Sequence, residues 1–225
     1  MLSAPNVYCQ SREWSTPRGL LATDSRAFLQ WLEAARPEPV AAHAKARALS
    51  ALPAEGEINV VDDSEQQKLA AVRELLRAMG RDAAYEIKVV DIPMARVGVY
   101  ERVAILISAP ALKVLEAEEL QALVAHELGH EYFIAGDEPM SGRPNERRLK
   151  ELELMCDAVA IVTLERLHLD SSRLVSAVEK ITRYNRLHRP GKMDESGYPT
   201  LSERRVFARQ VLAWLRRARV IEMKS

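Results

Sequence analysis

The run Val-Ala-His-Glu-Leu-Gly-His constrains the fold of this chain more than any other part of its sequence. Its histidines, His126 and His130, are four residues apart, so on an α-helix both imidazoles project from one side and can reach one metal ion. Glu127, beside the first histidine, could then take a proton from water activated by that metal. This chemistry requires a helix. Apolar residues at helical spacing, without a proline, predict one from Glu116 to Ala135, with Gly136 placed to end it.

Composition limits the classes of protein to which the chain can belong. At 225 residues it is long enough to enclose one hydrophobic core, and 48% of its residues are apolar. The formal net charge is zero, so there is no electrostatic case for binding nucleic acid or an anionic membrane. The most apolar stretch, residues 103–115, contains Ser108, Pro110 and Lys113 and is too short to cross a bilayer, so we expect no membrane span.

Two features bear on where the protein works. The first twenty residues lack the basic-then-apolar pattern of a signal peptide. The two cysteines, Cys9 and Cys156, cannot form a disulfide framework, and we interpret Cys156 as a small buried apolar residue. The sequence therefore predicts a cytoplasmic protein.

The pattern of apolar residues predicts an α+β fold that is mostly helical. We interpret residues 1–56 as an N-terminal helical extension and residues 57–225 as the main domain. The extension carries no motif with recognisable chemistry, so we expect a packing or dimer surface there, with helices over 24–36 and 40–52. In the main domain, helices are predicted over residues 62–80, 145–167, 170–188 and 200–220.

Three short runs are candidates for strands. The first is Ile58–Val61, and the other two, Tyr85–Ile92 and Val97–Ile107, are joined around residues 93–96. Tyr85–Ile92 alternates apolar with polar residues, as a half-buried strand does. The two longer runs together predict a β-hairpin that leads directly into the helix of His126, so that a small sheet packs on this helix.

Catalytic zinc usually takes three protein ligands and leaves a fourth position for water. The remaining histidines are His43, His168 and His188. The helix after Asn145 offers better candidates, because Glu153 and Asp157 lie one turn apart and share a face. Such a pair can divide the work: Glu153 binds the metal, while Asp157 accepts the free N–H of a liganding histidine and fixes its tautomer. The alternatives to Glu153 as the ligand are Glu146, Glu151 and Asp157.

These motifs resemble those of the gluzincin metallopeptidases, in which His-Glu-x-x-His is followed by Glu-x-x-x-Asp. Residues 118–130 and 153–158 are most similar to the HtpX and CAAX prenyl protease family. That family has a His-Pro dipeptide before a helix bearing Glu-Arg, and its histidine is thought to stabilise the transition state. The matching stretch here, Tyr198 to Arg204, keeps the proline and the Glu-Arg pair but has Tyr198 in place of the histidine. A phenol can also donate a hydrogen bond to an oxyanion, so Tyr198 is a candidate for that role.

The resemblance covers residues 85–210 in outline and implies a zincin-like catalytic domain with one zinc ion. It implies a zinc endopeptidase in which Glu127 is the general base. The expected substrate is a peptide or unfolded protein, lying extended along an edge strand such as Val97–Ile107. Family members often span membranes, whereas no span is predicted here, so cleavage of intramembrane or prenylated substrates is not implied.

Two other functions stay open at this point. The first is a zinc-stabilised binding or scaffold module with little or no hydrolysis, motivated by the missing histidine at position 198 and the extra N-terminal segment. The second is a protease gated by that segment, if residues 1–56 cover the cleft.

Overall fold

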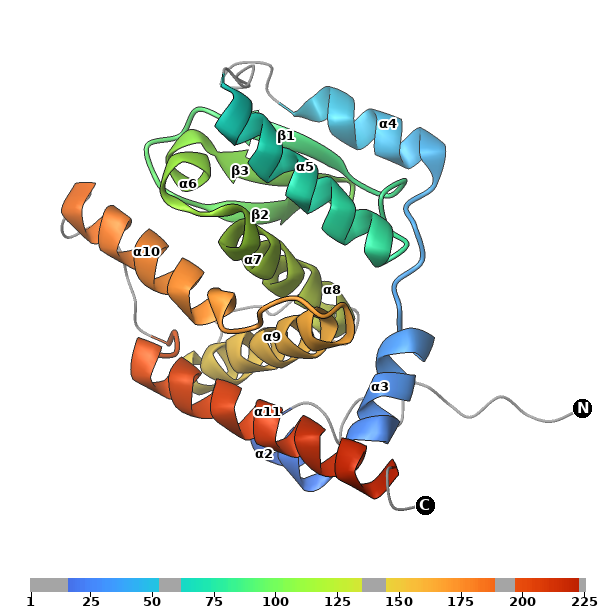
Figure 1. Ribbon diagram of the computed structural model, residues 1–225. Coiled ribbons are helices and arrows are strands. Elements are labelled where there is room, and N and C mark those ends of the chain that lie inside the picture. Colours follow the sequence, from blue (N-terminus) through green and yellow to red (C-terminus); the bar gives the residue numbers. More distant parts are fainter. Residues whose placement is uncertain (1–15, 53–61, 135–144, 189–196, 223–225) are drawn as a thin grey trace, which may run out of the picture.

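The computed structural model describes residues 16–52, 62–134, 145–188 and 197–222. It has an α+β fold that is mostly helical, as the sequence predicts, with one three-stranded sheet in the described part of the chain. Helix α7 (Ala117–Gly129), which carries the His-Glu-Leu-Gly sequence, lies between this sheet and helix α9 (Glu146–Arg166), with α11 (Leu201–Glu222) packed on the far side of α9 (Figure 1). The predicted packing of a small sheet on the histidine helix is therefore confirmed.

The sheet consists of β1 (Glu86–Val90), β2 (Val97–Tyr100) and β3 (Ala104–Ser108), in the order β1-β3-β2. The central strand, β3, pairs in parallel with β1 and antiparallel with β2. Ile105 and Ile107 of β3 are fully buried, as expected for a strand with apolar residues and a neighbour on each side. Strand β2 is left at the edge and contacts α7.

The predicted hairpin between residues 85–92 and 97–107 is wrong. The hairpin lies within the second run, because a turn between Tyr100 and Val103 divides it into β2 and β3; the Val103 N–H donates to the Tyr100 carbonyl at 2.9 Å. The more apolar half, β3, takes the centre of the sheet and separates β1 from β2. A short helix, α6 (Ala109–Val114), then intervenes before α7, and the predicted strand over 58–61 lies outside the described residues.

Helix α7 is shorter than predicted. It ends at Gly129, and a short helix, α8 (Glu131–Ile134), follows after His130; position 136 lies outside the described residues. Helix α7 packs against α5 (Asp63–Ala78), α9 and α10 (Arg173–His188) as well as β2, so nearly all of its faces are buried. A helix surrounded in this way is held in place firmly enough to fix the positions of its polar side chains.

Glu119 anchors the first turn of α7. Its carboxylate accepts hydrogen bonds from the Glu116 N–H at 2.8 Å, the Ser176 hydroxyl at 2.6 Å and the Lys180 ammonium at 2.7 Å. Burial acts to raise the pKa of Glu119, but these hydrogen bonds and the Lys180 charge outweigh it, so the pKa lies below its usual value of 4.5. The last two partners belong to α10, so Glu119 also ties α7 to α10.

The lowered pKa gives Glu119 a stabilising role that depends on pH. A carboxyl whose pKa is depressed by folding stabilises the folded state above its unfolded pKa, and this contribution is lost as the pH falls through the folded pKa. We expect Glu119→Gln to lower the free energy of unfolding by about 1.5–3 kcal/mol at pH 7, with the difference shrinking below pH 4.5. Denaturant titrations at a series of pH values measure this difference in the free energy of unfolding. Glu118→Gln, at an exposed position, is the control. A difference that did not change between pH 7 and pH 3 would contradict this assignment.

The other predicted helices of the main domain form close to their predicted bounds. Helix α5 begins after Asp62, whose carboxylate accepts from the Glu65 N–H at 2.7 Å. Helix α9 begins after Asn145, whose side chain accepts from the Arg147 N–H at 3.0 Å. The predicted capping box of α11 is present: the Thr200 N–H donates to Glu203 at 2.7 Å, and the Glu203 N–H donates to the Thr200 hydroxyl at 3.2 Å.

The N-terminal part contains the two predicted helices, α3 (Ser25–Ala34) and α4 (Ala42–Ala51), and an additional one, α2 (Pro17–Ala22). Helix α3 packs on α11: the Phe28 ring lies 5.7 Å from that of Trp214 between centroids, and the Trp214 indole donates to the Thr23 carbonyl at 2.8 Å. Phe28 and Trp214 belong to the same buried apolar cluster as the residues of α7 and α9. The side chains of α3 therefore complete the core of the main domain.

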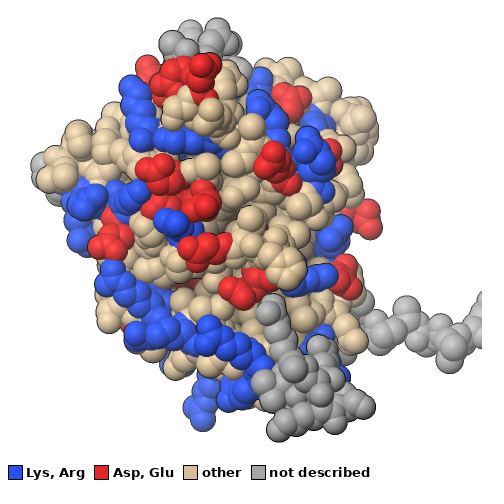
Figure 2. Space-filling view, in the orientation of Figure 1, with Lys and Arg blue, Asp and Glu red and all other residues tan. Residues whose placement is uncertain are grey.

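The surface carries charges of both signs. Acidic and basic side chains are interspersed over most of the face in Figure 2, with a row of Lys and Arg over α11. This distribution agrees with the net charge of zero. Within the described ranges, no helix combines the length and the apolar character that crossing a membrane requires.

Candidate metal centre

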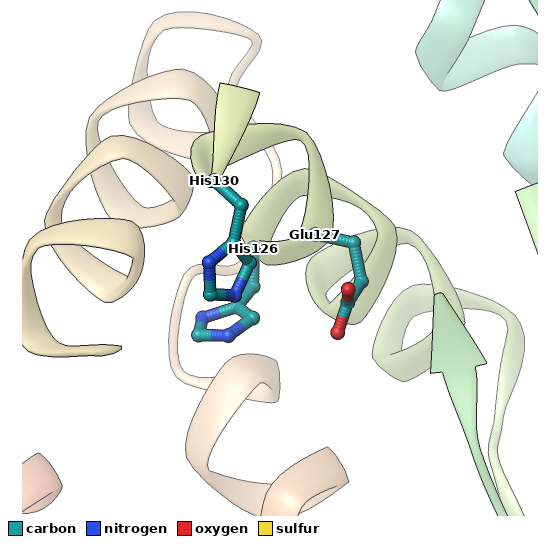
Figure 3. A group of neighbouring side chains, drawn as sticks. All are labelled: His126, Glu127 and His130. Atoms are coloured by element: carbon teal, nitrogen blue, oxygen red, sulfur yellow. The ribbon is translucent and has the colours of Figure 1, made fainter. Parts of the chain in front are cut away.

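His126, Glu127 and His130 lie together on the last turns of α7. Their possible ligand atoms are all within 4.8 Å of one another, and the imidazole rings are 5.1 Å apart between centroids. Figure 3 shows the two rings side by side, with the Glu127 carboxylate directed to the same side of the helix. His126 is buried, whereas His130 and Glu127 are partly exposed. This group could hold a metal ion with one side open to solvent.

Helix α9 brings two carboxylates to the histidines, and both are buried. Asp157 accepts a hydrogen bond from Nδ1 of His126 at 2.8 Å, which leaves Nε2 of this imidazole as the free nitrogen. The Glu153 carboxylate faces both histidines: Oε2 lies 3.4 Å from Nε2 of His126, and Oε1 lies 3.6 Å from Nε2 of His130. The two carboxylates therefore stand where the sequence analysis expected a ligand and its supporting partner.

Each oxygen of the Glu153 carboxylate lies near one of the two histidines, at a separation close to that between two ligands of a zinc ion. Two donor atoms about 2.05 Å from a zinc ion in tetrahedral geometry lie roughly 3.4 Å from each other. The observed separations, 3.4 and 3.6 Å, are longer than an ordinary N–H···O hydrogen bond and close to this edge length. His126, His130 and Glu153 thus form a three-residue donor set of the composition found in catalytic zinc sites.

Gly129 permits the close crossing of α7 and α9 that creates this arrangement. A Cβ atom at Gly129 would lie 3.0 Å from Cα and 3.1 Å from the carbonyl oxygen of Cys156, which are backbone atoms that cannot rotate away. Cys156 is itself fully buried, as expected, and burial raises the pKa of its thiol well above the usual value. The small residue at 129 therefore sets how near Glu153 can come to the histidines.

We expect Gly129→Ala to destabilise the protein even though alanine favours helices. The gain in helix propensity is about 1 kcal/mol, whereas overpacking against a rigid backbone costs about 1–3 kcal/mol and would also move α9 away from His130. Denaturant titration combined with a zinc-binding titration measures both effects. Gly98→Ala is the matched control, because its Cβ would meet nothing closer than 3.8 Å. If Gly129→Ala had the stability and zinc affinity of the wild type, the close contact of α7 and α9 at Gly129 would not limit the packing.

Arg204 was missed as a site residue by the sequence analysis, which used it only as part of a motif. Its guanidinium is buried and binds both carboxylates, with Nη1 on Asp157 and Nη2 on Oε2 of Glu153 at 2.9 Å. Helix α11 supplies it, beginning at the Thr200 capping box four residues earlier. The Glu-Arg pair at 203–204 was the available signal, but nothing in the sequence showed that this arginine points into the protein.

The buried charges set the protonation of the site. Burial acts to lower the pKa of His126, but its contacts with Asp157 and Glu153 outweigh this and raise the pKa to about 10. Burial and the neighbouring His126 charge lower the pKa of His130 to about 4. Burial acts to raise the pKa of Glu153, but the histidines and Arg204 lower it to about 2. Since a metal ion competes with protons for imidazole nitrogen, binding of a metal would release the proton from His126.

Glu127 lies in a different electrostatic setting. Burial raises the pKa of its carboxyl above the usual value of 4.5, and the negative charge of Glu153 adds to this effect. The positive charge of Arg96, beside the edge strand β2, is among those that act in the opposite direction. No sequence motif points to Arg96.

Tyr198 stands close to the site but is not hydrogen-bonded to it. Its side chain is 46% exposed, and no hydrogen bond joins it to the site residues that the structure describes. Burial raises the pKa of its hydroxyl, and the charges of Glu153 and Glu127 contribute, which places the phenol in their electrostatic neighbourhood. His188 is exposed, stacks on Tyr184 and bonds to the Tyr184 carbonyl, so it does not belong to the group.

Comparison with known proteins does not identify a family for this chain. No protein-family model matches the chain, and a search of curated proteins finds no significant match. Membership of the metallopeptidase family that the motifs resemble therefore stays a prediction, and the site has to be judged from its own residues.

Proposed function

We propose that this protein is a zinc-dependent endopeptidase in which His126, His130 and Glu153 hold one zinc ion. The observation that carries the proposal is the geometry of the donor set. A carboxylate from one helix lies 3.4 and 3.6 Å from two imidazole nitrogens of another, and Asp157 holds the first imidazole in the required tautomer. Zinc bound there would supply Lewis-acid polarisation of a carbonyl and would acidify a water molecule.

Glu127 is the general base of the proposed reaction. Its carboxylate faces the same space as the imidazole nitrogens, within 4.8 Å of them, and its partly exposed position lets it contact water there. A pKa raised from the usual carboxyl value brings a base nearer to the operating pH, which favours proton transfer. Glu127 takes the proton from the attacking water and passes it to the leaving amine.

Tyr198 is the proposed donor to the oxyanion. Its raised pKa keeps the phenol protonated at neutral pH, so the hydroxyl can donate a hydrogen bond. Because the site residues make no hydrogen bond to it, the hydroxyl is available to a substrate carbonyl. It would take the role that a histidine has in the family that the chain resembles.

The substrate is proposed to be a peptide or an unfolded protein. Strand β2 is an edge strand that contacts α7, so an extended peptide can add to it by main-chain hydrogen bonds and pass beside the histidines. Arg96 comes just before β2 and acts on the pKa values of both Glu127 and Tyr198, so it lies beside this path.

Two observations bear on the other functions that the sequence left open. The half-exposed Tyr198, which makes no hydrogen bond to the described site residues, favours a zinc-stabilised module with weak hydrolysis. Leu20, Phe28 and Trp31 belong to the buried core, which disfavours a gate made of the whole of residues 1–56.

Hydrolysis of an unfolded protein tests the proposal. The purified full chain is incubated with reduced, alkylated casein as it is, after treatment with a chelator, and after zinc is added back. We expect cleavage that the chelator abolishes and zinc restores. Stoichiometric zinc binding without any cleavage would favour the scaffold module, and cleavage unaffected by the chelator would rule out metal-dependent hydrolysis.

A further inference from the structure

A cavity of about 50 Å³, lined in part by charged side chains, lies away from the metal centre. The cavity is formed where the segment between α3 and α4 meets the end of α5 and the turn between β2 and β3. Three arginines line it, one from each of these segments: Arg36, Arg81 and Arg102. None of the proposed metal ligands contributes to its wall.

The cavity has more positive than negative charge around it. Arg81 and Arg102 share one buried carboxylate, that of Glu131, at 2.6 and 3.5 Å. Arg81 also bonds to the Tyr85 hydroxyl at 2.9 Å, and the same hydroxyl donates to Glu131. Glu38 is the acidic residue among those that line the cavity, and it is exposed. Three guanidinium groups therefore face one buried carboxylate and one solvated one.

Arg81 retains an unused donor. Its side chain is 6% exposed, and its Nη1 atom is buried without a hydrogen-bond partner among the described residues. A buried charged donor left unpaired is unfavourable, so native structures rarely keep one without a ligand, ion or water to satisfy it. Arg81 is one of the residues that line the cavity, so such a partner would bind beside it.

Arg102 is held in an unfavourable backbone conformation. Glu101 and Arg102 form the turn between β2 and β3 with φ angles of 47° and 58°, a conformation that hairpin turns usually give to asparagine or glycine. The Arg102 guanidinium also donates to the Glu38 carbonyl at 2.7 Å, which connects the turn to the opposite wall of the cavity. Strain of this kind is concentrated at binding and catalytic sites, where the side chain has a use.

We propose that this cavity binds a small oxyanion of the phosphate class. A tetrahedral oxyanion presents several acceptors, and arginine is the residue best suited to bind them in pairs. The volume of about 50 Å³ exceeds the roughly 10–15 Å³ that a single water requires, and the exposed Arg36 and Glu38 at the rim leave a way in from solvent. The bound anion would accept from the arginines that line the cavity and draw Arg36 and Arg102 together across the mouth.

Isothermal titration of the full chain with inorganic phosphate tests this proposal, with chloride at matched ionic strength as the reference. We expect one saturable site. Arg102→Asn should weaken phosphate binding about tenfold or more, because it removes a charged donor while asparagine tolerates the positive φ. Arg36→Gln should weaken binding in the same direction. Glu101→Asn is the matched control from the same turn and should bind phosphate no more weakly than the wild type.

The outcomes that would overturn the proposal are distinct from those of the hydrolysis assay. No saturable binding at millimolar phosphate, or equal binding by Arg102→Asn and the wild type, would contradict it. Phosphate binding that disappears when zinc is chelated would place the anion at the metal centre instead. A parallel titration with phenyl phosphate separates the two sources of the ligand: tighter binding than inorganic phosphate indicates a phosphomonoester, and weaker binding indicates the free ion.

Discussion

Glu127→Gln is expected to abolish hydrolysis while leaving the metal bound. Glutamine has nearly the same shape but cannot accept the proton from water, and a general base typically contributes about 10²–10⁴-fold to the rate. Because Glu127 is not one of the three proposed ligands, zinc content should stay the same. The measurements are kcat/KM on a peptide substrate and zinc per chain on the same preparation.

The matched control for this variant is Glu151→Gln on α9. Glu151 pairs with Arg147 on the surface and makes no contact with the histidines, so hydrolysis should continue at the wild-type rate. If Glu127→Gln cut peptides as fast as the wild type, another group would have to be the base. If it lost zinc together with activity, Glu127 would be a ligand instead, since its carboxylate lies within 4.8 Å of the imidazole nitrogens.

Arg204→Met is expected to cause the largest loss of stability among single substitutions at the site. Arg204 forms a buried ion pair with both Glu153 and Asp157, and removing one partner from a buried ion pair costs about 3–5 kcal/mol because the remaining charges are left uncompensated. A bound zinc ion would compensate part of this charge, so the loss should be greater in the metal-free protein than in the presence of zinc. Chemical denaturation with chelator and with zinc measures both values.

The neighbouring residue provides the control for this variant. Arg205 is exposed and pairs with Glu179, and surface ion pairs contribute only about 0–1 kcal/mol, so Arg205→Met should be nearly neutral. Two outcomes would mean that Arg204 does not hold the two carboxylates. The first is equal destabilisation by the two substitutions, and the second is an equal loss of stability in Arg204→Met with and without zinc.

The sequence predicted those parts of the fold that local patterns determine. Helix starts depend on a capping side chain within four residues, so Asp62, Asn145 and Thr200 could be recognised as caps before the structure was known. The proximity of Glu153 and Asp157 followed in the same way from their spacing on one helix. The interruption of the histidine helix after Gly129 was not predicted, because no proline or capping residue at that position marks it.

The remaining features depend on contacts between distant segments. Strand order was predicted wrongly, because alternation within a strand does not say which neighbour it takes, and the buried β3 came between β1 and β2. Arg204 binds partners 47 and 51 positions earlier, and the arginines of the second cavity come from three separate segments. No local pattern shows that these side chains meet their partners, so the structure was needed to find the contacts.

Metal analysis of the natively purified protein, together with anomalous scattering at the zinc absorption edge of its crystals, tests the central claim most directly. The account predicts one zinc ion per chain, with its scattering peak between Nε2 of His126, Nε2 of His130 and the Glu153 carboxylate. A protein that is isolated without metal and takes up no zinc on titration, or one whose metal lies elsewhere, would contradict it.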